Sequence, residues 1–281
     1  MWGDPFAGYV LALVRATLRT YGRLLAAGFR RGSAYPLAAL GGLVANATFG
    51  LLKVAILFAT LDAGGGTVGG YDVGAMSAYI WLSQGLLGSV NLFGRTAVAD
   101  RIRNGDIAVD FARPLDVQAA SVTTEVGTRL FALLPRGVPS VLLGVVLVGM
   151  TMPTTPLPYV LGALSVLLGI VLSCTTVYLV AVAGFWLVEG RGLQILYMVM
   201  SGFLAGLFVP IPLFPAWLRT VAAATPFPSM LQHPVDVLSG RVDVATSARL
   251  LAVQLGWLAL TVVVGAVLTR AGRVRLEVQG G

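Results

Sequence analysis

Charge and reactive side chains are scarce in this chain of 281 residues. It has one cysteine, one histidine and 11% charged residues, whereas a soluble domain typically carries about a quarter. A single cysteine excludes an internal disulfide and a multi-cysteine metal site, so we expect Cys174 to pack as a small apolar residue. His233 lies in a proline-rich stretch with no acid or nucleophile at a fixed spacing. These shortages disfavour a hydrolase triad or a metal-dependent enzyme.

Hydrophobic residues, by contrast, make up 57% of the chain and gather in long runs without charge, namely 32–52, 73–94, 137–188, 192–218 and 250–269. About 20 apolar residues cross a bilayer as a helix, so the runs count as one, one, two, one and one spans. The longest run holds two because prolines break it at 153, 156 and 158. The runs lack the alternation of a β-barrel. We therefore predict one all-α integral membrane domain over 1–281 with six transmembrane helices.

Arginine crowds into every second gap between these runs. Connections 62–72 and 151–156 contain no basic residue, whereas the predicted cytoplasmic segments hold Arg15, Arg19, Arg23, Arg30, Arg31, Arg95, Arg101, Arg103, Arg113, Arg191, Arg270, Arg273 and Arg275. This asymmetry predicts that both termini face the cytoplasm. The net charge of +7 is thus a topology signal with some contact to anionic membrane lipids, and it does not indicate nucleic-acid binding.

The N-terminal segment, residues 1–31, predicts an amphipathic helix that lies on the membrane surface. At 100° per residue, four arginines of residues 8–31 fall within about 80° of one another, and apolar residues occupy the opposite side. Such a helix lies in the interface plane. The alternative is a basic flank that only sets the topology.

Between the second and third spans, segment 98–120 mixes charges of both signs with apolar residues. Its apolar members are Ile102, Ile107, Val109, Phe111 and Leu115. An apolar ridge with a charged rim suits docking onto another protein. An ordinary solvated loop is the alternative.

Between the fifth and sixth spans, segment 210–240 is apolar but rich in proline, with five prolines from Pro210 to Pro228. Because proline repeatedly breaks helices, we expect short re-entrant pieces at the outer membrane boundary. Non-helical backbone at that depth needs protein or a water-filled cavity beside it. Phe214 and Trp217 are alternatively aromatic-belt anchors.

Several motifs, in this order, resemble the permease subunits of ABC-2 type exporters: Gly105-Asp106-Ile107, Arg113-Pro114-Leu115, Phe185-Trp186, Phe214-Pro215, Trp217-Leu218, Pro226-Phe227, Pro234 and Gly240. The resemblance is to the bacterial branch of ABC-2 family transporter proteins that includes viologen and drug exporters. It implies ATP-driven export, including multidrug efflux, across the bacterial inner membrane. Two ATPase subunits and a second permease, homologous or identical, are the implied partners.

The resemblance also implies site residues. Segment 98–120 resembles the family's coupling segment, where the ATPase would contact Arg101, Arg103, Asp106, Ile107, Phe111, Arg113 and Pro114. The substrate path would be lined from spans two and five by Ser83, Gln84, Asn91, Gln194, Met198 and Phe203. Serine and glutamine also hold helices together and methionine fills gaps, so packing is the alternative role for each.

The chain's only lysine, Lys53, bears on two further predictions. A phosphate-binding loop needs a lysine after glycine, but Lys53 follows Leu52. We therefore expect no cofactor on this chain, with ATP and Mg²⁺ on the partner ATPase. A lysine at the centre of a span costs about 2.5–3.5 kcal/mol. The position of Lys53, two turns from Leu61, favours snorkelling outward over a role with substrate or ion.

An ion-coupled secondary transporter is the main alternative, since it too would consist of apolar helices. Such transporters usually show internal repeats, broken helices at the midplane and buried carboxylates. Glu125 and Glu189 fall near the predicted cytoplasmic ends of spans, and no internal repeat is visible.

Overall fold

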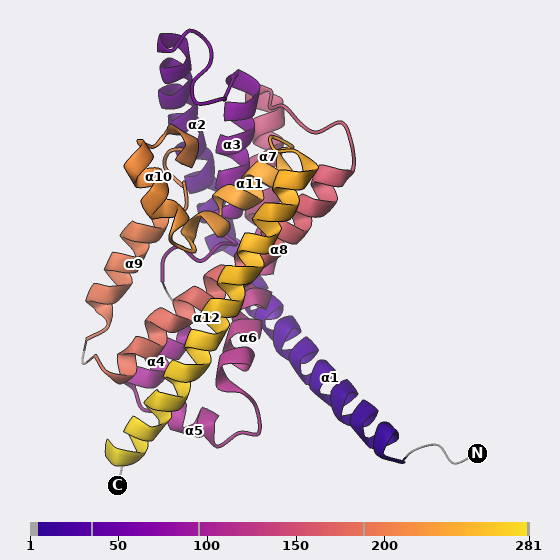
Figure 1. Cartoon of the computed structure of the whole chain (residues 1–281), viewed down its shortest axis with the longest axis vertical. Coiled ribbons are helices and arrows are strands. Elements are labelled where there is room, and N and C mark those ends of the chain that lie inside the picture. Colours follow the sequence, from indigo (N-terminus) through magenta and orange to yellow (C-terminus); the bar gives the residue numbers. More distant parts are fainter. Residues whose placement is uncertain (1–4, 35, 95, 188, 280–281) are drawn as a thin grey trace.

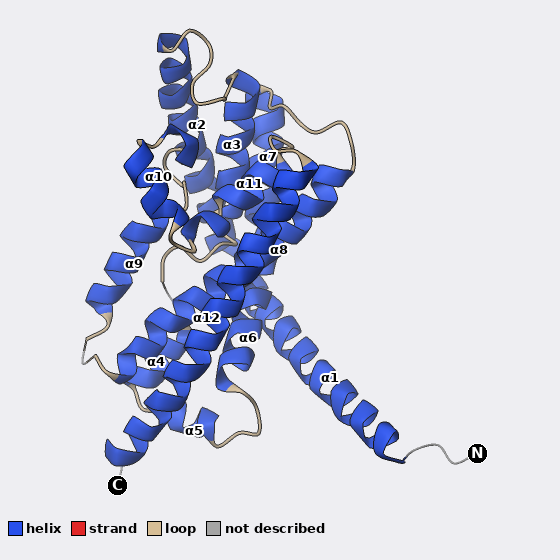
Figure 2. Cartoon of the chain, viewed as in Figure 1, coloured by secondary structure: helices blue, strands red, loops and turns tan. Residues whose placement is uncertain are grey.

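In a computed structural model, the chain forms a bundle of helices from which the N-terminal helix projects as an arm (Figure 1). The structure describes residues 5–34, 36–94, 96–187 and 189–279, so Arg95 lies outside the described residues. Within these ranges the chain consists of helices and loops (Figure 2), and the β pairing is limited to one isolated bridge, between Val68 and Tyr71. The all-α prediction is confirmed.

The helices follow one another with short connections. The α-helices are α1 (Pro5–Ser33), α2 (Pro36–Ala63), α3 (Val73–Leu86), α4 (Ala97–Arg103), α5 (Ile107–Phe111), α6 (Val117–Ala132), α7 (Val138–Leu143), α8 (Leu157–Val182), α9 (Arg191–Leu204), α10 (Ala216–Ala223), α11 (Gln232–Leu238) and α12 (Val244–Gln279). The π-helical turns are η1 (Leu133–Gly137) and η2 (Gly144–Val148), and the 3₁₀ turns are η3 (Ala183–Phe185), η4 (Ile211–Leu213) and η5 (Phe227–Ser229).

In the described part of the chain, four helical stretches are long and apolar enough to cross a membrane: Ala39–Ala63, Val117–Val148, Leu157–Phe185 and Val244–Arg275. They match the first, third, fourth and sixth predicted spans. Helices α3 and α9 have 14 residues each, or about 21 Å, and are too short to cross a hydrocarbon core of about 30 Å alone. Six crossings therefore stay a prediction.

The third span begins 20 residues earlier than the uncharged run that predicted it. The run starts at residue 137, but the helix starts at Val117 and carries Glu125, Arg129 and Arg136 inside it. Pro139 has no amide hydrogen to donate, and the π turn η1 directly precedes it. The sequence rule failed because it required each span to be free of charge.

Two sets of contacts mark opposite ends of the bundle, which we call outer and inner after the orientation that the sequence predicts. At the outer end, the Thr151 amide donates to the Gly74 carbonyl (3.3 Å), and Gly240 packs against Pro153. At the inner end, the Phe185 ring stacks on Phe111 and fills the space over Gly272. Helix α8 connects the two ends, and α12 returns beside it (Figure 1).

Proline divides the region between α9 and α12 into the short helices η4, α10, η5 and α11. The expected break into short pieces is confirmed, whereas their depth in a membrane stays a prediction. Trp217 is 68% exposed, which suits an aromatic anchor, but Phe214 is buried. Helix α11 packs on α8, so the region is anchored to the bundle.

The hydrophobic core has two clusters. The larger one joins Tyr79 and Trp81 of α3 to Ile170 and Cys174 of α8, all buried. Burial of Cys174 confirms the expectation that it packs as an apolar residue. The smaller cluster lies at the inner end and packs α4 and α5 against the end of α8. Large apolar side chains are also exposed along α2, α9 and α12, as lipid contact requires.

Candidate functional site

The predicted second span is not a continuous helix. Helix α3 ends at Leu86, and residues 87–94, which we call the interrupted segment, run on without helical structure. Gly94 has φ +68°, a conformation that glycine adopts without steric cost. A Cβ atom there would also lie 3.0 Å from the Tyr197 ring, so the segment passes close against α9. The expectation of one helix over 73–94 was wrong.

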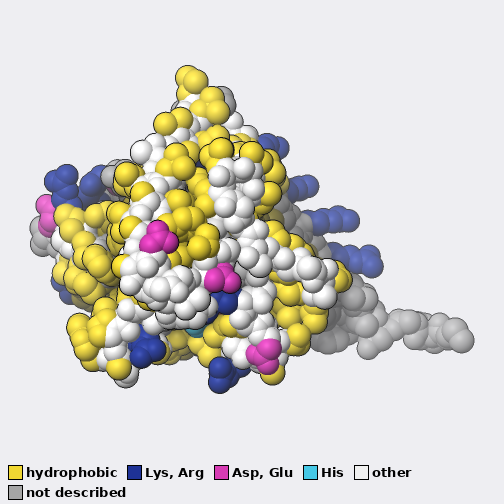
Figure 3. Space-filling view, turned by 90° about the horizontal axis from the view of Figure 1, so that it is seen from above, with side chains coloured by type: hydrophobic (Ala, Val, Ile, Leu, Met, Phe, Trp, Pro, Cys, Tyr) yellow, Lys and Arg dark blue, Asp and Glu magenta, His cyan; other side chains and the backbone are white. Residues whose placement is uncertain are grey.

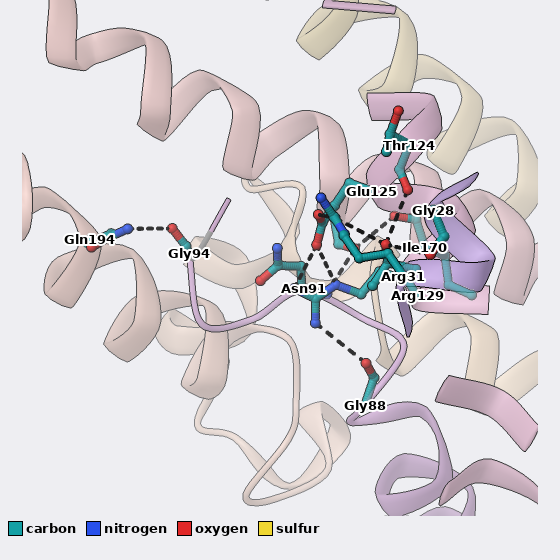
Figure 4. Close-up of polar contacts among 12 residues, drawn as sticks. Gly28, Arg31, Gly88, Asn91, Gly94, Thr124, Glu125, Arg129, Ile170 and Gln194 are labelled. Carbon is teal, nitrogen blue, oxygen red and sulfur yellow. Dashed lines mark hydrogen bonds and ion pairs between the residues drawn. The ribbon is translucent and has the colours of Figure 1, made fainter. Parts of the chain in front are cut away.

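One face of α9 bonds the carbonyl groups of the interrupted segment. Gln194 Nε2 donates to the Gly94 carbonyl (2.9 Å; Figure 4), and Tyr197 Oη donates to that of Asn91 (2.8 Å). Ser201 Oγ donates to the Leu92 carbonyl (2.8 Å). The three donors lie at positions i, i+3 and i+7, hence on one side of the helix. The polar stripe of α9 thus replaces the bonds that a continuous helix would have made.

Two other helices complete this bonding. The main-chain amide of Asn91 donates to Ser173 Oγ of α8 (3.0 Å). Arg129 Nη1 of α6 donates to the Gly88 carbonyl (3.5 Å; Figure 4). Irregular backbone inside a membrane protein is tolerated where neighbouring protein satisfies it. The interrupted segment meets that condition through α6, α8 and α9.

Next to it, Glu125 of α6 holds two arginines. Its carboxylate accepts from Arg31 of α1 (2.9 Å) and from Arg129 (2.9 Å; Figure 4). Arg31 also donates to Thr128 Oγ1 (3.0 Å). The Glu125 carboxylate thus pairs with both guanidinium groups, of which that of Arg31 is exposed and that of Arg129 is half-buried. The cluster links the N-terminal arm, α6 and the interrupted segment.

Helix α1 is an arm only over its first half. Near its end it crosses α6 so closely that a Cβ on Gly28 would lie 1.9 Å from the Thr124 carbonyl oxygen. The preceding part carries exposed Val14 and Leu18 together with basic residues, which project in a row beside the arm in the view from the outer end (Figure 3). A helix with both kinds of exposed side chain suits a membrane interface.

The predicted coupling segment folds as the short helices α4 and α5 at the inner end. Asp110 of α5 accepts from Arg101 Nε of α4 and lies 3.6 Å from Arg113 Nη1. Phe111 stacks on Phe185 with ring centroids 6.2 Å apart, and the Arg273 guanidinium of α12 lies 5.7 Å from its ring. Ion pairs and stacking therefore hold α5 firmly against α4, α8 and α12.

Two cavities of about 630 and 430 Å³ open beside α4 at the inner end. Both are lined by Ala99, Asp100 and Gln194. The smaller one extends to Arg31 and Glu125, and the larger one to Glu189 and Arg191. The two cavities therefore lead from the surface at the inner end to Gln194, which bonds the interrupted segment.

The chain matches one family of known proteins over most of its length. The family described as ABC-2 family transporter protein matches residues 44–280. The chain belongs to that family. Comparisons with the curated proteins and with the solved structures returned no match. Family membership confirms the resemblance to ABC-2 type permeases, whereas the viologen and drug branch stays a prediction.

In this ABC-2 chain, the apolar ridge expected on the coupling segment is mostly turned inward. Ile102 and Ile107 are buried in the inner core cluster, and Phe111 and Leu115 are half-buried. Only Val109, 55% exposed, offers a free apolar surface among the five. Ile107 and Phe111 therefore position the segment, and its exposed rim consists of Arg103, Asp106, Val109, Arg113 and Pro114.

The predicted substrate-path residues fall into three groups. Ser83, Gln84 and Asn91 are buried within one copy of the chain, and Ser83 Oγ bonds the Ile80 carbonyl of its own helix. Met198 (41% exposed) and Phe203 (53% exposed) lie outside the polar stripe of α9. Gln194 reaches the inner cavities. Sequence reasoning did not single out Tyr197, Ser201 or Arg129; the spacing of Gln194, Tyr197 and Ser201 was the available signal.

Lys53 neither snorkels outward nor stands free. Its Nζ donates to the Leu207 carbonyl, just beyond the end of α9, and Tyr79 Oη of α3 donates to the neighbouring Gly206 carbonyl. Gly206 has φ +79°, and the Leu207 amide bonds the Gly202 carbonyl, which closes α9 in a Schellman turn. The snorkelling prediction was wrong because a closer acceptor, the main-chain carbonyl of buried Leu207, lies inside the protein.

At the outer end, Asp236 of α11 is 7% exposed and accepts from Arg241 Nε and Gln232 Nε2, both at 3.0 Å. Burial raises the pKa of the Asp236 carboxyl, and the Arg241 guanidinium opposes that shift. The Arg241 guanidinium also lies 4.4 Å from the centroid of the Tyr71 ring. This network ties the α2–α3 connection to α11.

Proposed function

We propose that the chain is the transmembrane permease subunit of an ATP-binding cassette exporter, supplying half of the cargo path and driven by a separate ATPase. The supporting observation is the α4–α5 element of an ABC-2 family chain. Its exposed rim, which includes Arg103, Asp106 and Arg113, faces outward, while Ile107 and Phe111 fix its base to α8. A partner that pushes on this rim would move α4, α8 and α12 together.

The energy would come from the partner. Lys53, the only lysine, bonds the Leu207 carbonyl inside the bundle, and no G-x-x-x-x-G-K-[ST] loop exists in the sequence. ATP and Mg²⁺ would therefore bind a separate ATPase. We propose a complete exporter of two ATPase subunits and two permeases, the second identical or homologous to this chain.

Six membrane crossings, with both termini in the cytoplasm of a bacterium, complete the proposal. Four helices are long enough to cross, and each short helix, α3 or α9, continues as non-helical chain toward the opposite end of the bundle (Figure 1). The arginine asymmetry supports the orientation. The short helices of 210–240 would then lie at the exoplasmic boundary.

For the cargo path we propose the exposed side of α9. Met198 and Phe203 are exposed apolar side chains on α9, and Gln194 on the same helix opens to the inner cavities. A second permease facing this surface would enclose a path between the two copies. Drug-like cargo is the expectation that the resemblance to the drug-exporter branch carries.

An ion-coupled secondary transporter is the second candidate, and the broken α3 and α9 spans favour it. Two observations weigh against it. Donors from α6 and α9 already occupy the carbonyl groups of Gly88, Asn91, Leu92 and Gly94, and Glu125 is paired with two arginines. Dependence of transport on ATP or on an ion gradient distinguishes the two.

The test is reconstitution of the chain in liposomes with the ATPase that copurifies with it. We expect ATP hydrolysis to increase several-fold when the permease is present, and the increase to be lost with Arg113→Glu. Arg219→Glu, at an exposed position on α10 near the outer end, is the matched control. Hydrolysis unaffected by the permease, or cargo movement without nucleotide, would contradict the proposal.

A further inference from the structure

Helices α3 and α9 are complementary half-spans. Helix α3 starts at the outer end and stops at Leu86, and α9 starts at the inner end and stops at Leu204. Each then continues as non-helical backbone that lies against the other helix. Helix α9 bonds the interrupted segment through three side chains, and Tyr79 of α3 bonds Gly206 after α9. If the chain crosses the membrane six times, as proposed above, both C-terminal helix ends lie inside the bilayer.

A helix C-terminus carries a partial negative charge from its unpaired carbonyl groups. Inside a membrane this charge must be met by protein or by a bound ion. In this chain a basic side chain bonds the main chain just past each helix end: Arg129 reaches the Gly88 carbonyl, two residues after α3, and Lys53 bonds the Leu207 carbonyl, three residues after α9. The Gly202 and Phe203 carbonyl groups of α9 itself are paired within its Schellman turn. Discontinuous helices of secondary transporters use such ends to hold a coupling cation.

The two basic residues differ in their other partners. Arg129 also pairs with Glu125 at 2.9 Å. Among the described residues no carboxylate pairs with Lys53, whose hydrogen bond goes to the α9 end. An ammonium group in an apolar span is expensive unless something of opposite charge meets it. The Leu207 carbonyl, just past the end of α9, is therefore the acceptor that holds Lys53 inside the protein.

We propose that Lys53 and Arg129 are internal cationic caps. They stand where an ion-coupled transporter would bind its cation, and they join α3, the interrupted segment and α9 into one unit that keeps its internal bonds throughout transport. Lys53 is a positioning residue in this arrangement and does not touch cargo. The proposal rests on the six-crossing permease proposed above. Because the two basic residues stand in place of a coupling cation, the proposal predicts that ATP-driven turnover is independent of sodium.

Leu207 offers a direct probe, because Lys53 bonds its main-chain carbonyl and a cysteine side chain there leaves that acceptor in place. In a Cys174→Ala background, Leu207→Cys is expected to resist maleimide, since Leu207 is 7% exposed. Adding Lys53→Met should raise the labelling rate at least about tenfold, and Lys53→Arg should restore protection. Arg249→Met, which removes an exposed arginine of α12, is the control and should change nothing. Protection that survives Lys53→Met would overturn the capping role.

The permease alone suffices for that measurement, so its result does not depend on the proposed ATPase. A second arm uses the complex with its ATPase, free of nucleotide and trapped with ADP and vanadate. If the unit is rigid, Leu207→Cys should be equally protected from maleimide in both states. ATP hydrolysis should be equal in sodium and in N-methylglucamine buffers. Labelling of Leu207→Cys that appears only in the trapped state would show that this unit opens during transport, and would overturn the proposal that it is rigid. ATP hydrolysis that requires sodium would overturn the proposal that Lys53 and Arg129 stand in place of a coupling cation.

Discussion

Gly28 of α1 and Gly127 of α6 stand opposite each other where the N-terminal arm meets the bundle. A Cβ on Gly28 would lie 1.9 Å from the Thr124 carbonyl oxygen, and one on Gly127 would lie 2.1 Å from that of Leu25. Neither position tolerates a side chain without separating the two backbones. This crossing places Arg31 beside Glu125 and so joins the arm to the interrupted segment.

Gly28→Leu should therefore release the arm. We expect tryptic cleavage at the arm arginines to accelerate about tenfold and the melting temperature to fall by several degrees, because the backbone carbonyl of Thr124 cannot move aside. Gly22→Leu is the matched control on the same helix, since no atom lies within 4 Å of a Cβ there. Equal proteolysis of the two variants would disprove the close crossing.

Arg113→Glu tests the rim of the coupling segment. Arg113 is exposed and lies 3.6 Å from Asp110, so reversing its charge leaves the core intact but places two acids side by side. We expect normal membrane insertion with loss of permease-stimulated ATP hydrolysis. Unchanged stimulation and export would show that the ATPase docks elsewhere.

Tyr197→Phe removes one donor from the interrupted segment and leaves the buried Asn91 carbonyl without that hydrogen bond. An unmet buried acceptor costs about 1–3 kcal/mol, so the melting temperature of the purified protein should fall measurably. Tyr159→Phe removes a hydrogen bond to the Pro153 carbonyl at an exposed site and should have little effect. Equal losses in both variants would mean that the α9 stripe does not support the segment.

His233 of α11 makes stability depend on pH. Burial lowers the pKa of His233 from its usual 6.5 to about 4, so between these values the unfolded chain binds a proton that the folded protein does not. Stability should therefore be complete above pH 6.5 and fall as the pH drops toward 4. The melting temperature of wild type should show this slope, and His233→Gln should flatten it. A parallel decline in the variant would assign the effect to other groups.

The sequence predicted what apolar runs and prolines determine. The prolines at 153, 156 and 158 separate the third and fourth spans, and those from Pro210 to Pro228 divide the outer region into short helices, as expected. These features are local, because proline removes a backbone donor wherever it stands.

The half-spans were not predicted, because their cause is tertiary. Residues 73–94 read as one apolar helix, yet donors from α6 and α9 and an acceptor from α8, far away in sequence, make a non-helical course equally well bonded. Glycines at 85, 88 and 94 were the local sign that helix propensity is weak there. The charges of the third span were missed for a related reason: Glu125 and Arg129 neutralise each other one helical turn apart.

Cysteine labelling of intact cells tests the central claim, six crossings with both termini inside, most directly. In a Cys174→Ala background, exposed positions Thr67, Thr154 and Ala245 mark the outer end, and Asn104 and Gly190 mark the inner end. A membrane-impermeant maleimide should label single cysteines at the first three positions in intact cells. It should label those at Asn104 and Gly190 only after the membrane is permeabilised. Labelling of Asn104→Cys from outside, or protection of Thr67→Cys and Ala245→Cys, would contradict the account.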